Sequence, residues 1–263
     1  LVPAKVVTTI LDTTNASSPT PGSLRAAITL PSPADRVIEF NDYLFAASVG
    51  TTHNPTGLAL GDFRGTGKTD VVSASSFLNN FYLATDNGNA VGILNRGVTA
   101  NTVTANITAI ETANLNGDTK ADFISVQSDG SVRAYLGSAT GTFTAGGVVS
   151  LGGTSAGLVV GDFDGDGKTD FASVLTGSTG KIVYALGDGA GGFGALQTIN
   201  LANGNQVAIA MADVTGDLKN DLVTLSSDGK LTTVPGTGTG FGTAVVSTVA
   251  GTTLSSLALG DLN

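Results

Sequence analysis

The sequence predicts an all-β protein made of repeated four-stranded units. Its 37 glycines accompany 41% hydrophobic and only 13% charged residues, a composition typical of many short strands joined by tight turns. A nine-residue acidic loop begins at positions 62, 114, 162 and 213 and starts again at 261, so successive copies lie 52, 48, 51 and 48 residues apart. A nearly constant period of this length indicates a repeat architecture.

Each repeat contains four strand patterns. In the third repeat, an apolar strand at 157–161 leads into the loop at 162–170, and further strands follow at 170–175, 181–186 and 196–201. Such units predict the blades of a β-propeller, at 56–106, 107–154, 155–206 and 207–253, with the start of a fifth at 254–263. Because a propeller needs a closed ring, either the N-terminal segment completes a blade or further repeats lie beyond residue 263.

Residues 1–50 differ from the repeat region at 51–263, because they hold most of the prolines and no acidic loop. We expect a β-rich N-terminal cap over an exposed sheet edge. Its predicted elements are a strand at 5–11, one helical turn at 22–28 and a strand at 36–40.

A phenylalanine recurs after the third strand of three repeats. Phe143, Phe193 and Phe241 follow the starts of their loops by 29, 31 and 28 residues. A recurrent aromatic residue in a glycine-rich turn predicts a packing anchor between neighbouring sheets, and stacking on a ligand is the weaker alternative.

The third loop, at 162–170, has the chemistry of a calcium site. Oxygen-bearing side chains at alternate positions can surround one hard cation, and Gly167 permits the sharp turn. An acidic turn without metal is the alternative, but it would leave four carboxylates repelling one another. The predicted ligands are the side chains of Asp162, Asp164, Asp166 and Asp170 and the backbone carbonyl of Lys168, whose ammonium is expected to point to solvent.

Two other loops predict weaker calcium sites, because Thr119 and Leu218 replace the glycine of the turn. The ligand sets are Asn114, Asn116, Asp118, Lys120 and Asp122 in the second loop, and Asp213, Thr215, Asp217, Lys219 and Asp221 in the fourth, with each lysine again contributing its carbonyl. In the first loop Arg64 and Thr66 replace two ligands. Since an arginine there can pair with Asp62 or Asp70, we expect this loop to hold no metal.

These repeats resemble the FG-GAP/VCBS repeats of integrin α-subunit propellers and of many bacterial surface proteins. The resemblance covers residues 56–263, and the third loop matches the family pattern D-x-D-x-D-G-x-x-D in full. It implies that calcium is held between the first two strands of a blade. Residues 22–40 resemble a short motif near the start of β-rich bacterial adhesin-like regions, which implies an exported surface protein.

The composition argues against several function classes. A net charge of −9 and a pI of about 4.3 do not suit a nucleic-acid partner, and no apolar run is long enough to span a membrane. With no cysteine and one histidine, the chain lacks the residues of hydrolytic triads. The string at 65–69 is similar to a phosphate-binding loop, but its glycine spacing is wrong and a strand follows it.

The predicted function is therefore that of a non-enzymatic, calcium-stabilised, extracellular protein of adhesion or structure. Its expected partners at the cell surface are other protein subunits, copies of itself in a surface filament or layer, and surface ligands that include glycans. Two alternatives remain, a carbohydrate-binding, lectin-like propeller module and a non-catalytic region of a larger secreted enzyme. The absence of Trp and the presence of only 4 Tyr disfavour the lectin, because sugars usually stack on aromatic side chains.

Overall fold

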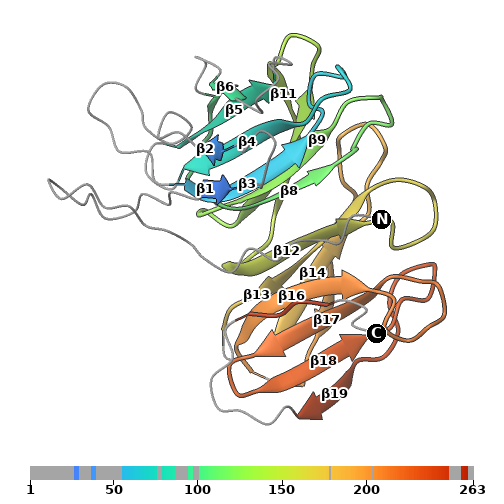
Figure 1. Cartoon of the computed structure of the whole chain (residues 1–263). Helices are drawn as coiled ribbons and strands as arrows, with labels where there is room; N and C mark the ends of the chain where they lie inside the picture. The colour runs from blue at the N-terminus through green and yellow to red at the C-terminus, as the bar shows by residue number, and fades with distance from the viewer. Residues whose placement is uncertain are drawn as a thin grey trace, which may run out of the picture.

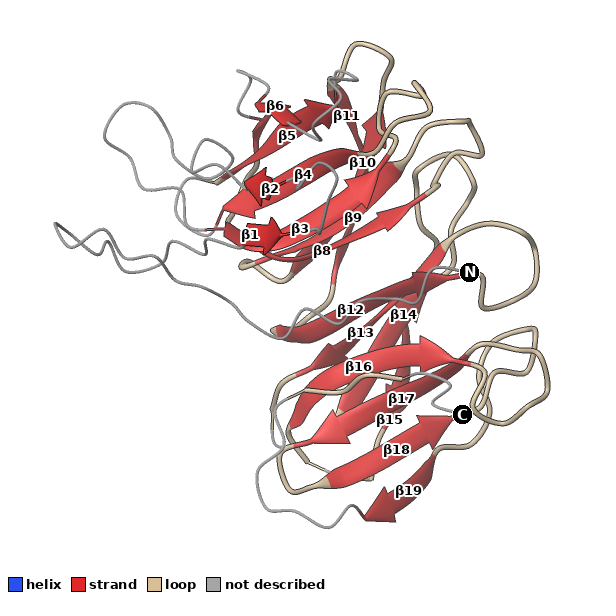
Figure 2. Cartoon of the chain, in the orientation of Figure 1, coloured by secondary structure: helices blue, strands red, loops and turns tan. Residues whose placement is uncertain are grey.

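The computed structural model describes residues 27–29, 37–39, 55–75, 79–86, 94–96, 101–177, 179–202, 204–248 and 256–259. Every regular element in these ranges is a β-strand (Figure 2), which confirms the all-β prediction. The same ranges contain no helix long and apolar enough to cross a membrane.

The N-terminal region contributes one two-stranded antiparallel sheet. Its strands are β1 (Ala27–Thr29) and β2 (Val37–Glu39), and Ile28 pairs with Ile38. The strand predicted at 36–40 is confirmed. The helical turn predicted at 22–28 is wrong at its C-terminal end, because Ala27 and Ile28 are extended and lead into β-branched Thr29. The strand predicted at 5–11 lies outside the described residues.

Four larger antiparallel sheets follow, one for each complete repeat, and we call them blades 1 to 4. Blade 1 contains β3 (Pro55–Gly61), β4 (Asp70–Ser75), β5 (Asn80–Asp86), β6 (Leu94–Arg96) and β7 (Asn101–Thr102). Blade 2 contains β8 (Ile107–Ala113), β9 (Asp122–Gln127), β10 (Ser131–Gly137) and β11 (Phe143–Ser150). Blade 3 contains β12 (Ser155–Gly161), β13 (Asp170–Leu175), β14 (Lys181–Ala185) and β15 (Gln197–Asn200). Blade 4 contains β16 (Gln206–Ala212), β17 (Asp221–Ser226), β18 (Lys230–Val234) and β19 (Val245–Thr248).

Each blade is an up-and-down meander whose strands pair in chain order. In blade 1, β6 and β7 both pair with β5 and share the fourth position. The first strands of consecutive blades contact one another in the order β3, β8, β12, β16, so they form the inner row around which the blades are arranged (Figure 1). This arrangement is that of β-propeller blades, as predicted.

The hydrophobic core lies between the sheets, in three clusters. Each cluster joins residues of two consecutive blades, for example Phe81 with Phe123, Val126 with Phe171, and Ile182 with Leu222. A sheet with both faces packed in this way needs apolar residues on both faces of its middle strands, and all residues of β4, β9, β13 and β17 are buried.

The recurrent phenylalanines are packing anchors, as predicted. The ring centroid of Phe143 lies 5.6 Å from that of Phe63 in blade 1, and the ring of Phe241 lies 5.1 Å from that of Phe163 in blade 3. Phe193 packs into the cluster between blades 2 and 3. Aromatic pairs at these separations add stabilisation beyond their buried area.

The fifth repeat, predicted to begin at 254–263, is described only at 256–259. These four residues form no strand, although the sequence predicts one at 254–259.

Candidate metal centre

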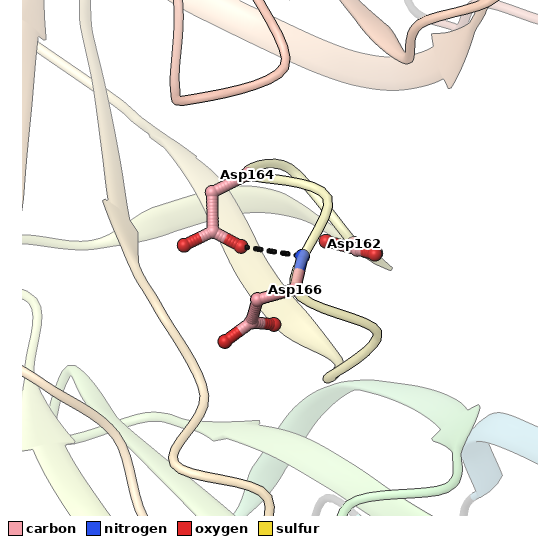
Figure 3. Close-up of side chains that lie close together, drawn as sticks. All are labelled: Asp162, Asp164 and Asp166. Carbon is pink, nitrogen blue, oxygen red and sulfur yellow. Dashed lines mark hydrogen bonds between the residues drawn. The ribbon is translucent and has the colours of Figure 1, made fainter.

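The acidic loop of blade 3 brings three carboxylates together. The loop connects β12 with β13. It begins at Asp162, directly after Gly161, and ends at Asp170, which pairs with Gly161. One side-chain oxygen of each of Asp162, Asp164 and Asp166 lies within 4.8 Å of the others (Figure 3). The position of the loop between the first two strands agrees with what the sequence resemblance implies.

Backbone N–H groups fix the shape of this loop. Oδ1 of Asp162 accepts a hydrogen bond from the N–H of Gly165 at 2.7 Å, and Oδ2 accepts one from Gly167 at 2.9 Å. The N–H of Asp166 donates to Oδ1 of Asp164 at 3.2 Å (Figure 3). Gly165 and Gly167 have φ of +79° and +80°, which favours glycine. A carboxylate oxygen has a second lone-pair direction, so these bonds leave capacity for a cation.

Asp170 has a different environment from the other three. Its side chain is buried, Oδ2 accepts from the N–H of Phe163 at 2.7 Å, and Oδ1 accepts from the N–H of Gly187 at 2.7 Å. It therefore ties the start of the loop to the end of the third strand of the blade. Burial raises the pKa of Asp170 to about 6, and the charges of Asp164 and Asp162 act in the same direction, while the two backbone hydrogen bonds oppose them. A cation in the loop would favour its ionised form.

The same contact occurs in blades 2 and 4. Asp122 accepts from the N–H groups of Leu115 and Gly137, both at 2.8 Å. Asp221 accepts from Val214 at 2.9 Å and from Gly236 at 2.8 Å. Sequence analysis did not predict this role. The sequence feature that could have indicated this contact is a glycine 15 or 17 residues after the last aspartate of each of these loops.

The side chains of Lys168 and Lys219, at the seventh loop position, are 43% exposed, and each ammonium also pairs with a carboxylate at the surface. Nζ of Lys120, Lys168 and Lys219 lies 2.6, 2.6 and 3.0 Å from a carboxylate oxygen of the aspartate two positions earlier. The hydrogen bond from Lys168 lowers the pKa of Asp166, and Lys120 acts in the same way on Asp118. A short i, i+2 ion pair therefore neutralises one ligand position in each loop.

At its first position the fourth loop keeps both hydrogen bonds of the third, and the second loop keeps one of them. Oδ1 of Asn114 accepts from Gly117 at 2.8 Å, and Oδ1 of Asp213 accepts from Gly216 at 2.7 Å. Oδ2 of Asp213 accepts from Leu218 at 2.8 Å. Leu218 has φ of +64° at the position of the turn glycine, and its side chain is 95% exposed. The turn is therefore formed in the fourth loop despite a strained residue.

In the second loop, the side-chain amides of Asn114 and Asn116 both donate hydrogen bonds to Asp118. Nδ2 of Asn116 donates to Oδ2 of Asp118 at 3.3 Å, and Nδ2 of Asn114 donates to the carbonyl of Asp118 at 2.6 Å. In the fourth loop, Asp217 accepts from the N–H of Lys219 at 3.1 Å.

In the first loop Arg64 pairs with Asp70, one of the two partners that the sequence predicts. Nη2 of Arg64 lies 2.9 Å from Oδ1 of Asp70, and Nε lies 3.0 Å from Oδ2. Asp70 is fully buried. This bidentate contact places a cationic side chain where the third loop has Asp164.

Hydrogen bonds also link the loops of consecutive blades. The eighth residue of each loop donates to the carbonyl of the first residue of the preceding loop. The contacts are Ala121 N to Asp62 O at 2.9 Å, Thr169 Oγ1 to Asn114 O at 2.8 Å, and Asn220 Nδ2 to Asp162 O at 3.4 Å. The loops therefore lie along one rim of the row.

A pocket of about 320 Å³ opens on this rim between blades 2 and 3. Its lining includes Asn114, Lys168, Thr169 and Asp188 with several glycines, and no aromatic residue. The pocket lies beside the third loop and offers donors and acceptors to a small polar ligand.

Comparisons with known proteins support the repeat assignment. A family model described as an FG-GAP-like repeat matches residues 114–173 and 162–224. No curated protein matches this sequence.

Several solved structures are similar to the chain. Two structures of BBS1N in complex with ARL6DN, soaked with mercury and with lead, have 12% identity and TM-scores of 0.55 and 0.54. They cover 80% and 82% of this chain, and 59% and 61% of their own. A lectin of Agrocybe aegerita that recognises non-reducing terminal N-acetylglucosamine has 20% identity and a TM-score of 0.49, covering 71% of this chain and 50% of its own. The chain thus spans 50% to 61% of the length of these structures. At 12% identity, the similarity to the two BBS1N structures shows the propeller-like fold of the chain and nothing further.

Proposed function

We propose that the chain is a calcium-stabilised, non-enzymatic module of an extracellular protein of adhesion or structure, a proposal that the match of an FG-GAP-like repeat model to residues 114–173 and 162–224 supports. The observation that carries the proposal is the convergence of Asp162, Asp164 and Asp166 in a loop shaped by its own backbone. Carboxylate oxygens in such a loop are the ligands that calcium prefers. Bound calcium would offset the repulsion among three carboxylates and would stabilise the connection between β12 and β13.

The proposed extracellular location is consistent with weak calcium binding. Extracellular calcium modules have dissociation constants of roughly 10⁻⁴ to 10⁻³ M. At millimolar calcium, mass action at one such site adds about 0.4 to 1.4 kcal/mol to the free energy of unfolding. The module would therefore be most stable where calcium is abundant, and it would bind other subunits or surface ligands there.

Isothermal titration calorimetry and thermal unfolding test the proposal. The wild-type chain should bind calcium and melt at a higher temperature in calcium than in chelator. Asp164→Ala should abolish most of both effects, because it removes a ligand oxygen without touching the buried Asp170. The matched control is Asp129→Ala, which removes an exposed carboxylate in the turn between β9 and β10. An identical melting temperature of the wild type with and without chelator would refute the calcium proposal.

A second candidate function is carbohydrate binding in the pocket between blades 2 and 3. The observation that favours it is the polar lining of Asn114, Lys168, Thr169 and Asp188 within about 320 Å³. A sugar there would be held mainly by hydrogen bonds, since the lining contains no aromatic ring and Leu115 is its one large apolar residue. A glycan array with the wild type and Asp188→Ala tests this candidate, and a wild type that binds no glycan contradicts it.

A further inference from the structure

The pocket between blades 2 and 3 is lined by two of the predicted calcium loops. Asn114 and Leu115 come from the second loop, Lys168 and Thr169 come from the third, and Asp188 comes from the turn after β14. Because blades 1 and 4 flank this pair of blades, the ends of the chain form no part of the pocket. The pocket and the third loop share residues, so a ligand bound in one can affect binding in the other.

Hydrogen bonds hold the backbone around this pocket in place. Thr169 Oγ1 donates to the carbonyl of Asn114 at 2.8 Å, and the N–H of Gly191 donates to the carbonyl of Leu115 at 2.9 Å. The second loop is therefore tied both to the third loop and to the turn after β14. A pocket whose walls are already formed binds a ligand at a lower entropic cost.

Lys168 is the one basic residue of the pocket lining. Its ammonium lies 2.6 Å from Oδ2 of Asp166, a predicted calcium ligand. Its aliphatic part packs over the turn after β14, because a Cβ placed on Gly189 would lie 2.9 Å from Cδ of Lys168. The lysine therefore lies between the calcium loop and the pocket, with its charge directed to the loop.

Calcium and Lys168 compete for the same carboxylate. A divalent cation held by Asp162, Asp164 and Asp166 would lie close to the ammonium of the lysine, and two cations repel each other at this range. The ion pair is easily given up, because solvent screens an exposed pair. Bound calcium should therefore release the ammonium, and the four-carbon side chain of lysine is flexible enough to turn it toward the pocket.

Asp188 supplies the other charge of the pocket. Its Oδ1 accepts hydrogen bonds from the N–H groups of Ala190 and Gly192, at 2.7 and 2.8 Å. These two bonds lower the pKa of Asp188, and the charge of Lys168 acts in the same direction. Since a carboxylate has about four lone-pair sites, Asp188 can accept further hydrogen bonds from a ligand.

The charges of the pocket select the ligand. Without calcium, Asp166 neutralises Lys168, and the carboxylate of Asp188 repels anions. With calcium, the released ammonium can pair with one negative charge of a ligand, while Asp188, Asn114 and Thr169 offer hydrogen-bond partners to hydroxyl groups. A second negative charge on the ligand would meet Asp188 without a cation to neutralise it. The fitting ligand is a sugar with a single negative charge, carried by a carboxylate or a sulfate ester.

We propose that calcium in the third loop releases Lys168 from Asp166, and that the released ammonium binds the anionic group of such a sugar in the pocket between blades 2 and 3. This calcium switch rests on the proposed function, because it needs the calcium site, and it names the ligand class of the second candidate function. By thermodynamic linkage, calcium and the sugar each tighten the binding of the other by the same factor. The pocket therefore binds an acidic sugar best where calcium is abundant.

Calorimetry of the wild type with sodium D-glucuronate, D-glucose 6-sulfate and neutral D-glucose tests the calcium switch. In calcium, at least one charged sugar should bind several-fold more tightly than glucose, and comparison of the two charged sugars identifies the anionic group. In calcium-free buffer this binding should weaken several-fold. Calcium should in turn bind more tightly, by the same factor, when that sugar is present. A sugar that only complexed calcium in solution would make calcium binding weaker, so the sign of the change separates the two cases.

Substitutions of lysine test the role of the ammonium. Lys168→Met should lose the preference for charged sugars, while its calcium binding becomes about two-fold tighter. Lys168→Arg keeps the positive charge and should retain part of the sugar binding. The matched control is Lys120→Met, because Lys120 has the same loop position and lies 2.6 Å from Asp118 but does not line the pocket. This control should bind the sugars like the wild type. Undiminished binding of charged sugars by Lys168→Met would assign the anion to calcium itself and overturn the role of Lys168.

The outcomes also separate the calcium switch from the calcium site. A wild type that binds calcium but prefers no charged sugar over glucose overturns the switch and leaves the calcium site in place. Equal binding of the charged sugars with and without calcium does the same. A wild type that binds no calcium contradicts the proposed function, and the switch fails with it.

Discussion

Arg64 forms a bidentate ion pair with the fully buried carboxylate of Asp70, with Nη2 2.9 Å from Oδ1 and Nε 3.0 Å from Oδ2. Both residues lie in the first loop, which corresponds to the candidate calcium loop of blade 3. The guanidinium places positive charge inside the first loop, where the third loop has the carboxylate of Asp164. The two loops therefore neutralise a buried aspartate in different ways, by a side chain in blade 1 and, as we propose, by a cation in blade 3.

Arg64→Ala should destabilise the chain by about 3 kcal/mol, because it leaves a buried carboxylate without its charged partner. Urea unfolding measures this loss. The double variant Arg64→Ala/Asp70→Asn should recover part of it, since the neutral amide no longer needs the guanidinium. A loss of only about 0.5 kcal/mol, the value of an exposed ion pair, would contradict the structural role of this contact.

Lys168→Met should tighten calcium binding by the third loop. The ammonium of Lys168 pairs with Asp166 at 2.6 Å and competes with a cation for that carboxylate, while the backbone carbonyl is unaffected by the substitution. Because solvent screens an exposed ion pair, the dissociation constant measured by calorimetry should fall only about two-fold. Lys181→Met, at an exposed lysine that begins β14, is the control. Weaker binding by Lys168→Met would show that the ammonium supports the site.

Leu218→Gly should stabilise the fourth loop. Leu218 has φ of +64°, a conformation that costs an ordinary residue about 1 to 2 kcal/mol, and its 95% exposed side chain makes little packing contact. Since glycine also gains freedom in the unfolded chain, the net gain should be about 0.5 to 1 kcal/mol in thermal or urea unfolding. Leu218→Ala keeps the Cβ and should gain little. An equal gain from alanine would assign the effect to the loss of an exposed apolar surface instead of relief of strain.

Alanine should have unequal effects at two corresponding glycines of the inner strands. A Cβ at Gly61 would lie 2.6 Å from Cβ of Ala121, which cannot move without its backbone, so Gly61→Ala should cost about 1 to 3 kcal/mol. A Cβ at Gly161 would lie 2.6 Å from Cε of Met211, the end of a flexible side chain, so Gly161→Ala should cost under about 1 kcal/mol. Chemical unfolding of the two variants in parallel checks the order, and equal losses would contradict it.

The local pattern of the sequence determined the repeating parts of this protein. The spacing of the acidic loops, the alternation of short apolar runs with glycine-rich turns, and the recurrence of Phe143, Phe193 and Phe241 predict the blades and their aromatic anchors. These features can be predicted from the sequence because every repeat packs in the same way, through residues that lie only a few positions apart in the chain. The pairing of Arg64 with Asp70 was predictable for the same reason, since both residues lie in one nine-residue loop.

Only the tertiary structure decided which groups meet across strands and across blades. Asp170 accepts a hydrogen bond from Gly187, 17 residues later, because the third strand of the blade returns to the loop. The side chain of Lys168 turns back to pair with Asp166, and the sequence alone does not show which rotamer this lysine adopts. Leu58 and Leu257 begin the same five-residue motif, yet one is exposed and the other half-buried. Burial depends on which blade lies alongside, and identical local sequence cannot carry that information.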